Sequence, residues 1–293
     1  MTRCCLVVTT HERPDALERV LAAVAAQSRP PDELIVADDG SGPATAQVVA
    51  QYAARAPQPV HHVWQTHQGF RAGRIRNAAI AGTNCEYIVL LDGDMVAHPD
   101  FIADHLALAR RGYYGQGVRI LLDEAATERL LQPRSDLPGP LSPGLGLMRR
   151  AYAWRAPRLA RVLRGAANGV VAVKACNQGF WRDDLVAVNG FDEAMTGWGA
   201  EDKELCARLE NAGIRRQTLL CAAVAWHLGH PPASRVRADV NRARWQETAR
   251  TGRIRCAAGL DGHGRAEHRD FPVWRGPVAV AIRSQSIPHT RPS

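Results

Sequence analysis

The sequence predicts an α/β fold with a mostly parallel central sheet flanked by helices. First, short apolar runs such as residues 87–91 are too short for an isolated helix and suit strands buried on both faces. Second, segments with helical spacing of apolar residues separate these runs. Third, polar residues follow the strand ends, and in right-handed βαβ units these ends face one crevice where ligands bind.

The first half of the chain alternates strands with helices. Apolar residues recur at helical spacing from Leu17 onward, so we expect a helix between the loop 11–15 and Gln27. The expected strands cover residues 6–10, 33–37, 60–64 and 87–91. The other expected helices cover residues 44–54, 74–81 and 100–111, the last of them opened by Pro99.

The second half has weaker periodicity. An expected strand at 115–120 is followed by an irregular stretch, 122–146, that is rich in proline and glycine. Further strands are expected at 170–173, 177–180 and 217–225, and further helices at 184–191, 201–213 and 240–248. The tail, 251–293, loses periodicity, so we expect it to be loosely structured.

Residues 148–164 interleave arginines with apolar side chains. This pattern predicts a short basic amphipathic helix, interrupted near Pro157. Such a helix can dock on a membrane or contact an acidic substrate, and a solvated helix face is the alternative reading.

Length and composition fit a globular enzyme. The 293 residues suffice for one large α/β domain or two small ones, with a sizeable core. No apolar run approaches the roughly 18–20 residues of a membrane span, and residues 4–8 are too short for a signal peptide. We therefore expect a cytoplasmic protein, peripheral at the inner membrane face if the basic helix docks there.

Neither the basic residues nor the cysteines identify a function by themselves. Of the 37 basic residues that give a net charge of +8, only Lys174 and Lys203 are lysines. Arginine suits phosphates because its planar fork binds two oxygens at once, but charge alone does not select a partner. The seven cysteines are odd in number and lack CxxC pairs, so neither a disulfide framework nor a zinc site is indicated.

The apolar run at 87–91 ends abruptly in Asp92-Gly93-Asp94. Two carboxylates one residue apart, with a glycine that lets the backbone bend, can share a hard divalent cation that also holds a phosphate-bearing substrate. Taken alone, the two aspartates are better explained as turn residues after a strand. The other motifs of the chain favour the metal site.

Two expected helix starts carry charged residues of interest. Arg76 lies in the first turn of the helix 74–81, where arginine and backbone amides make a plausible diphosphate site. Glu201 and Asp202 lie in the first turn of the helix 201–213, where acidic residues also simply complement the helix dipole. Neither feature identifies a site by itself.

Taken in order, the motifs resemble the family 2 glycosyltransferases, which have the nucleotide-diphosphosugar transferase (GT-A) fold. The first half carries VVTTHERPDAL, ELIVADDGS, RIRNAAI and YIVLLDGDM. The second half, NGFDEAMTGWGAEDKELCARL followed by AWHLGH, resembles the acceptor-side region of chondroitin-polymerase-type and β-1,4-galactosyltransferase-like enzymes. The resemblance covers residues 4 to 232 and implies a nucleotide-sugar-binding half, 1–115, and an acceptor-binding half, 116–250, of one GT-A domain.

The resemblance also implies roles for individual residues. The nucleotide-sugar pocket is expected to comprise Thr10, Glu12, Arg13, Asp38, Asp39, Arg76, Asp92 and Gly93, with Arg76 near the diphosphate and Asp92 near the ribose and metal. Asp94 and His227 are the expected metal ligands, and Trp198 and Gly199 border the acceptor and donor sugar. Asp202 is the expected catalytic base, supported by Glu201.

The chemistry of sugar transfer calls for the same groups. Charge builds on the phosphate oxygens as a nucleoside diphosphate leaves, and oxygen ligands plus an imidazole favour Mn²⁺, or else Mg²⁺, to neutralise that charge. A carboxylate must take the proton of the attacking hydroxyl, and in-line attack inverts the anomeric carbon. We therefore expect an inverting, metal-dependent transferase that moves a sugar from a UDP-sugar to a glycan or lipid-linked acceptor.

Two alternative functions explain the sequence less completely than sugar transfer does. A nucleotidyltransferase would need a glycine-rich, lysine-bearing loop after the first strand, which THERPD does not provide. A non-catalytic basic module that binds nucleic acid or an anionic surface would leave the Asp-Gly-Asp and Glu-Asp pairs unexplained. We expect no nucleic-acid partner.

Overall fold

The computed structural model describes residues 1–143, 145, 147–163, 173–231 and 233–264. The strands are β1 Cys4–Thr10, β2 Glu33–Asp38, β3 Val60–Trp64, β4 Tyr87–Asp92, β5 Met95–Ala97, β6 Tyr113–Gln116, β7 Ile120–Leu121, β8 Asn177–Trp181, β9 Arg215–Thr218 and β10 Ala225–His227. The helices are α1 Pro14–Ala25, α2 Pro43–Ala53, α3 Ala72–Ala81, α4 Phe101–Leu108, α5 Glu124–Leu131, α6 Leu147–Tyr152, α7 Pro157–Leu163, α8 Arg182–Val188, α9 Glu201–Asn211 and α10 Ala238–Thr251, with a 3₁₀ turn, η1, at Leu260–His263.

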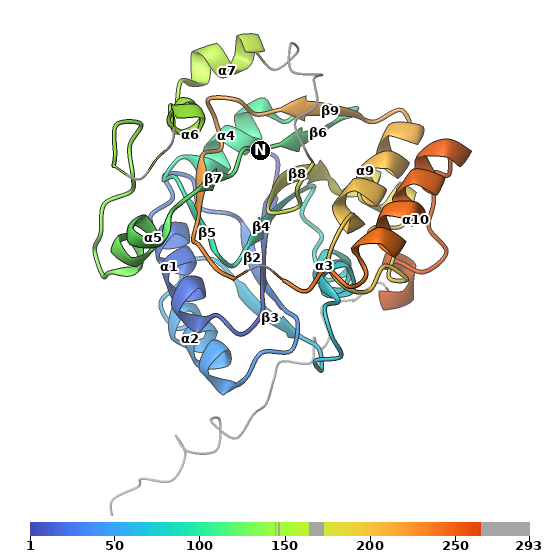
Figure 1. The fold of residues 1–293 in the computed structure, drawn as a ribbon, viewed down its shortest axis with the longest axis horizontal. Helices are drawn as coiled ribbons and strands as arrows, with labels where there is room; N and C mark the ends of the chain where they lie inside the picture. The colour runs from blue at the N-terminus through green and yellow to red at the C-terminus, as the bar shows by residue number, and fades with distance from the viewer. Residues whose placement is uncertain (144, 146, 164–172, 232, 265–293) are drawn as a thin grey trace, which may run out of the picture.

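A seven-stranded sheet in the order β3-β2-β1-β4-β8-β6-β9 forms the centre of the molecule (Figure 1). Strands β3, β2, β1 and β4 pair in parallel, as do β6 and β9, whereas β8 is antiparallel to both β4 and β6. The predicted α/β class with a mostly parallel sheet is therefore confirmed. A second, three-stranded sheet, β5-β10-β7, lies beyond the end of β4.

Helices cover both faces of the main sheet, as the apolar strand sequences predict. Because side chains alternate along a strand, β1 sends Leu6 and Val8 to one face and Cys5 and Val7 to the other. The first face packs against α1, α2 and α4, and the second against α3, α8 and α9. The strands are thus held rigidly, with their carboxyl ends free to carry polar residues.

Two predicted strands are wrong as continuous elements. Residues 115–120 divide into the end of β6 and β7, because the chain leaves the main sheet at Gly117, where a side chain would collide with Asn177. Residues 217–225 likewise divide between β9 and β10, because Cys221 and Ala223 have positive φ angles of 59° and 48°. These turns carry β7 and β10 into the second sheet.

The irregular stretch predicted at 122–146 contains a helix, α5. The side chain of Asp123 accepts a hydrogen bond from the Ala126 amide at 2.7 Å and caps its first turn. The basic segment 148–164 forms two helices, α6 and α7, with Pro157 as the first residue of α7. Arg164 and residues 170–172 of the strand predicted at 170–173 lie outside the described residues.

The prediction of a loose tail from residue 251 is wrong for residues 253–264. Cys256 and Leu260 are buried, and the Asn189 side chain donates a hydrogen bond to the Cys256 carbonyl at 3.1 Å. Arg253 forms an ion pair with Glu204 of α9 at 2.9 Å. The segment therefore packs against α8 and α9, and residues 265–293 lie outside the described part of the chain.

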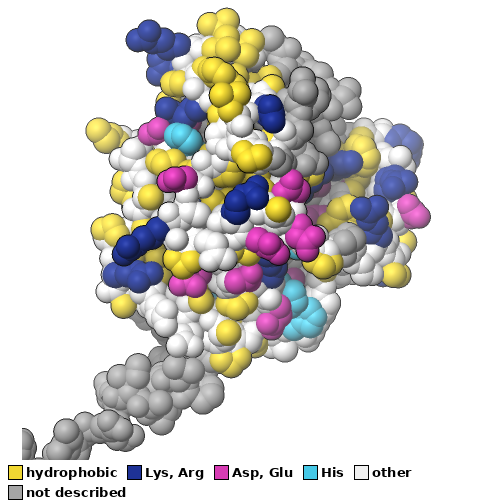
Figure 2. Space-filling view, turned by 60° about the vertical axis from the view of Figure 1, so that its left-hand side comes forward, with side chains coloured by type: hydrophobic (Ala, Val, Ile, Leu, Met, Phe, Trp, Pro, Cys, Tyr) yellow, Lys and Arg dark blue, Asp and Glu magenta, His cyan; other side chains and the backbone are white. Residues whose placement is uncertain are grey.

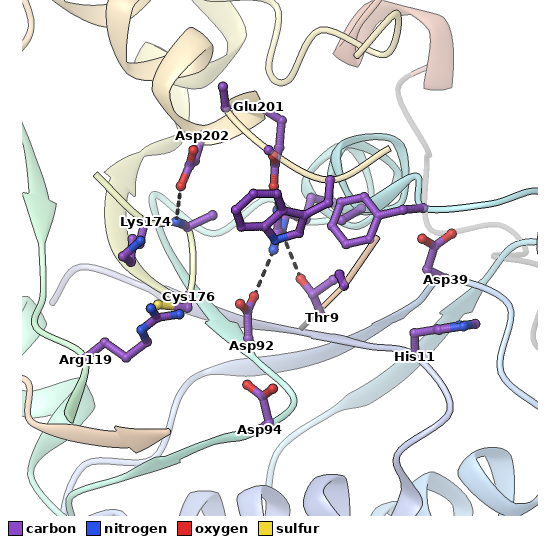
Figure 3. Close-up of a pocket in the computed structure, with 18 of the residues that line it drawn as sticks. Thr9, His11, Asp39, Asp92, Asp94, Arg119, Lys174, Cys176, Glu201 and Asp202 are labelled. Atoms are coloured by element: carbon purple, nitrogen blue, oxygen red, sulfur yellow. Dashed lines mark hydrogen bonds and ion pairs between the residues drawn. The ribbon is translucent and has the colours of Figure 1, made fainter. Parts of the chain in front are cut away.

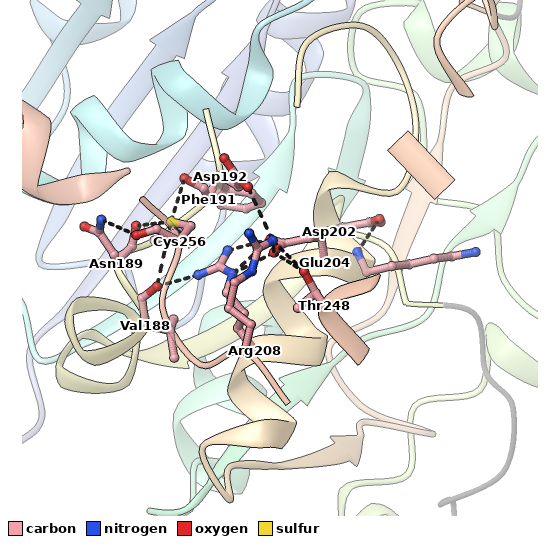
Figure 4. Close-up of polar contacts among 12 residues, drawn as sticks. Val188, Asn189, Phe191, Asp192, Asp202, Glu204, Arg208, Thr248 and Cys256 are labelled. Carbon is pink, nitrogen blue, oxygen red and sulfur yellow. Dashed lines mark hydrogen bonds and ion pairs between the residues drawn. The ribbon is translucent and has the colours of Figure 1, made fainter. Parts of the chain in front are cut away.

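A buried ionic network holds α9 in place. Glu204 and Arg208 are both fully buried and form an ion pair at 2.7 Å (Figure 4). Glu204 also accepts a hydrogen bond from Thr248 of α10 at 3.0 Å, and Arg208 donates to the carbonyl of Val188 in α8. Because breaking a buried pair typically costs about 3–5 kcal/mol, the start of α9 is firmly positioned.

No helix among the described residues is long and apolar enough to cross a membrane.

Candidate functional site

A cavity of about 620 Å³ opens where β1 and β4 end and α9 begins (Figure 3). Segments from the whole chain line it, from Thr9 in β1 to Trp245 in α10. The residues predicted from the sequence that line the cavity are Thr10, Arg13, Asp39, Arg76, Asp92, Gly93, Asp94, Trp198, Gly199, Glu201, Asp202 and His227. The fold therefore brings both predicted halves of the site together.

Two residues expected in the pocket do not line it. Asp38 is fully buried at the end of β2, where its carboxylate accepts hydrogen bonds from the Ser41 amide and from His62. Glu12 is exposed, has a positive φ of 47°, and accepts a hydrogen bond from the Gly42 amide. Both side chains stabilise the loops around the cavity, so the prediction that they line it is wrong.

Asp39 shapes the end of the cavity beside β1 and β2. Its carboxylate accepts hydrogen bonds from the Gln65 side chain at 2.6 Å and from the Arg71 amide at 2.7 Å. Figure 3 shows Asp39 and His11 together at this end, away from Asp202. The contacts of Asp39 fix the loop that precedes α3.

Arg76 connects the two halves of the site. It is 3% exposed, donates to the Thr9 hydroxyl at 3.0 Å and to Asp92 at 2.8 Å, and lies 3.6 Å from Glu201. Burial disfavours its charge, but Asp92 and Glu201 outweigh burial and raise the pKa of Arg76. A buried permanent cation is thus held between β4 and the start of α9.

Asp94, His227 and His230 form a cluster whose ligand atoms lie within 4.8 Å of one another. Asp94 Oδ2 is 3.5 Å from His227 Nε2 and 3.2 Å from His230 Nε2. Antiparallel pairing of β5 with β10 brings the two segments together, and the Leu228 amide donates to the Asp94 carbonyl at 2.9 Å. Two of these three residues were predicted as metal ligands, and His230 was missed.

The donor set fits a divalent cation. Asp94 Oδ1 is buried and, among the described residues, has no hydrogen-bond partner, so a strong acceptor faces the cluster unused. Burial lowers the pKa of His227 to about 4, so this imidazole is neutral at neutral pH, which is the form that binds metals. Although burial opposes it, the hydrogen bond with His230 helps to lower the pKa of Asp94 and keep it anionic.

Glu201 and Asp202 enter the cavity from the first turn of α9. Asp202 accepts hydrogen bonds from the backbone amides of Ala175 at 3.2 Å and Lys203 at 2.8 Å, which fix its carboxylate. Burial raises the pKa of Asp202 despite these bonds, and burial with the neighbouring Asp202 charge raises the pKa of Glu201 to about 7. The expected stabilisation by the helix dipole is therefore outweighed by burial at both carboxyls.

Trp198 and Gly199 lie in a tight turn that leads into α9. Gly197, Gly199 and Ala200 have positive φ angles of 78°, 114° and 65°, and a φ of 114° favours glycine at position 199. Trp198 is 40% exposed, and the Arg235 guanidinium lies 5.3 Å from its ring. The turn thus presents an indole at the cavity mouth, beside the two carboxylates.

Several lining residues had no assigned role in the sequence. They are His230, Arg119, Lys174, Lys203, Arg235, Arg242 and Trp245. His230 follows His227 at a spacing of three residues, and this repeat of histidine could have indicated a second ligand. The basic residues could not be distinguished from the many other basic residues of the chain without knowledge of the fold.

Two family models match separate parts of the chain. Residues 5–152 match the family model described as glycosyl transferase family 2. Residues 170–231 match the model described as the N-terminal domain of galactosyltransferase. The two matches correspond to the β1–α6 region and to the region from β8 to the histidine cluster.

Two relatives illustrate the range of similar proteins. Validoxylamine A glucosyltransferase of Streptomyces hygroscopicus subsp. limoneus is 29% identical over 236 residues, which cover 71% of this chain and 48% of that protein. Chondroitin synthase of Escherichia coli is 24% identical over 243 residues, which cover 77% of this chain and 34% of that protein. The chain spans less than half the length of either relative.

Solved structures share the fold. Residues 1–349 of S. aureus TarS in complex with UDP align with a TM-score of 0.58 at 15% identity, covering 89% of this chain and 68% of that chain. A longer TarS structure aligns with a TM-score of 0.52 at 18% identity, covering 78% of this chain and 37% of that chain. The predicted GT-A fold is confirmed.

Proposed function

The chain belongs to glycosyl transferase family 2, and from this membership we propose that it transfers a sugar from a UDP-sugar to a glycan or lipid-linked acceptor with inversion at the anomeric carbon. The observation that carries the proposal is one cavity that joins a candidate metal cluster, Asp94 with two histidines, to the oriented carboxylate of Asp202. Sugar transfer from a nucleotide needs both groups within reach of one substrate.

In this proposal the nucleotide occupies the end of the cavity formed by β1 and β2. Thr10, Arg13 and Asp39 line that end, and His11 lies beside Asp39 (Figure 3). Arg76 would remain charged next to the diphosphate, because Asp92 and Glu201 hold its guanidinium in place. Because the Arg76 guanidinium is already held in position, it can stabilise the negative charge of the diphosphate without rearranging.

Asp94, His227 and His230 would hold a divalent cation. A carboxylate with two imidazoles favours Mn²⁺ over Mg²⁺, which prefers oxygen ligands. When bound, such an ion would neutralise charge on the diphosphate as it leaves. In the structure the Asp94 carboxylate is paired with His230.

Asp202 would act as the base that takes the proton from the attacking hydroxyl. Its two backbone hydrogen bonds orient the carboxylate, and burial raises its pKa and therefore its basicity. Glu201 is committed to Arg76 at 3.6 Å and supports the site by keeping that cation in position. In-line attack from the Asp202 side gives inversion.

A thermal-shift experiment tests this proposal against the two alternatives. We expect saturating UDP with Mn²⁺ to raise the melting temperature by roughly 5–10 °C, because a ligand at 100 times its Kd stabilises by about 2.7 kcal/mol. A single-stranded oligonucleotide at the same concentration should cause no shift. A shift with the oligonucleotide and none with UDP would favour the basic binding module, and a shift with nucleoside triphosphate alone would favour a nucleotidyltransferase.

We also propose that α7 brings the enzyme to a membrane that carries a lipid-linked acceptor. Arg158 and Arg161 are exposed on α7, beside Leu159 and Val162, which are 47% and 76% exposed. Figure 2 shows hydrophobic and basic side chains gathered at the top of the molecule, where α7 lies in Figure 1. Arg155 does not contribute, because it pairs with Asp104 at 2.7 Å.

Vesicle binding tests this surface. We expect binding to vesicles with anionic lipid to fall as salt rises, and Arg158→Gln with Arg161→Gln to weaken it by about 2 kcal/mol in total, at about 1 kcal/mol per arginine. Arg244→Gln, an exposed arginine on α10, is the matched control. Equal binding to neutral and anionic vesicles would leave α7 as a solvated helix.

A further inference from the structure

Both lysines of the chain line the cavity, although 35 of the 37 basic residues are arginines. Each also lies next to Asp202 along the backbone hydrogen bonds that hold its carboxylate. Lys174 precedes Ala175, whose amide donates to Asp202 Oδ2, and the amide of Lys203 itself donates to Asp202 Oδ1. The two lysines therefore flank the candidate base from two segments that are distant in sequence, as Figure 3 shows for Lys174.

The ammonium groups of both lysines are available for a ligand. Neither makes an ion pair or a side-chain hydrogen bond within the described part of the chain, and the Lys203 Nζ lies 4.9 Å over the ring of Trp245. Both residues are only partly exposed. Two other charged groups of the cavity are paired within the site: Arg76 pairs with Asp92 and Glu201, and Asp94 pairs with its histidines.

The charge of Lys174 acts on Asp202, but neither ammonium is held in a direct ion pair among the described residues, and partly buried cations of this kind favour an anionic ligand. Removing an ammonium from water is costly unless an oxyanion replaces the lost hydration, and neutral hydroxyls compensate only partly. Lysine suits this task because its ammonium is a compact charge on a flexible stem and can follow one oxygen. Trp198 and Trp245 line the same end of the cavity and offer apolar faces to sugar rings.

Resting on the proposed function, in which the acceptor approaches Asp202, we propose that Lys174 and Lys203 form an acceptor subsite for an oxyanion, a carboxylate or a phosphate, close to the attacking hydroxyl. The enzyme thereby selects an acidic glycan or a phosphate-bearing polyol over a neutral sugar. Arg119 also lines the cavity, and its charge acts on Asp92 and His227.

Direct binding measurements test the subsite on the full chain. The probes are a disaccharide ending in glucuronate, the matched disaccharide ending in glucose, and a short glycerol-phosphate oligomer, each titrated with and without UDP and Mn²⁺. We expect at least one acidic probe to bind about tenfold or more tightly than the neutral one. The tighter of the two acidic probes identifies the source of the oxyanion.

Variants assign that preference to the lysines. Lys174→Met and Lys203→Met should each weaken the preferred acidic probe by about tenfold while the neutral probe is unchanged. Lys174→Arg should retain part of the preference, because it keeps the charge. The control Arg244→Gln, an exposed residue of α10 outside the cavity, should match the unmodified chain.

Three results would overturn the subsite. They are equal binding of acidic and neutral probes, equal loss of both in the methionine variants, and loss of UDP and Mn²⁺ binding in those variants as large as the loss of the acidic probe. If the unmodified chain fails to bind UDP, that result counts against the proposed function. The titrations without nucleotide still decide whether the lysines select an acidic ligand.

Discussion

Replacing Asp202 by asparagine is expected to lower the turnover of sugar transfer by at least about a hundredfold, the lower end for loss of a general base. The change keeps the size of the side chain and one oxygen, which can still accept a hydrogen bond from the backbone amide of either Ala175 or Lys203. UDP and Mn²⁺ should therefore bind nearly as before. Steady-state turnover, with nucleotide affinity measured on the same preparation, separates these two effects.

Two further variants sharpen the experiment on the base. Glu201→Gln should cost less turnover, because Glu201 acts through Arg76 and keeps one oxygen near that guanidinium. Asp183→Asn changes a carboxylate that is 81% exposed on α8 and should leave turnover unchanged. Near-normal turnover of Asp202→Asn with a true acceptor would place the base elsewhere and remove the main support for inversion.

Replacing Asp94 by alanine is expected to abolish transfer and to weaken UDP binding only when Mn²⁺ is present. Asp94 supplies the only carboxylate of the cluster, and loss of even an outer-shell partner typically costs 10–100-fold in metal affinity. His230→Gln should weaken Mn²⁺ binding in the same way, since it removes one imidazole. Titration of UDP with and without Mn²⁺ measures both changes.

UDP binding measured with and without Mn²⁺ decides whether Asp94 is a metal ligand. Asp239→Ala, at a side chain that is 91% exposed, controls for the loss of a carboxylate. If Asp94→Ala weakens UDP binding equally with and without Mn²⁺, Asp94 contacts the nucleotide directly and is not a metal ligand. An unchanged Mn²⁺ affinity in His230→Gln would limit the cluster to Asp94 and His227.

Much of the fold could be predicted because its strands are buried on both faces and its first helices are strongly periodic. The strands β1 to β4 appear within a residue or two of their predicted bounds. Prediction failed where the apolar pattern continues through a turn, as at Gly117 and Cys221. Apolar side chains there remain buried in either sheet, so hydrophobicity carries no signal for the change of direction.

Site residues that belong to a motif could be predicted from the sequence. Residues whose place in the site depends on side-chain direction or strand pairing could not. Asp38 and Asp39 are neighbours at a strand end, but successive side chains point to opposite faces, and only Asp39 reaches the cavity. His230 joins the cluster because β10 pairs with β5, which the sequence does not reveal. Lys174 comes close to Asp202 and its neighbour Lys203 only in three dimensions.

The position of β8 in the main sheet determines the order in which the cavity can assemble during translation. β8 separates β4 from β6, so the sheet cannot be completed until residues well past 177 have been synthesised. The histidines of β10 and the loop after it are synthesised later still. At about 5–20 residues per second, on the order of ten seconds separates Asp94 from His227 on the ribosome. The nascent chain can therefore build the end of the cavity formed by β1 and β2 before Asp202, His227 and His230 have been synthesised.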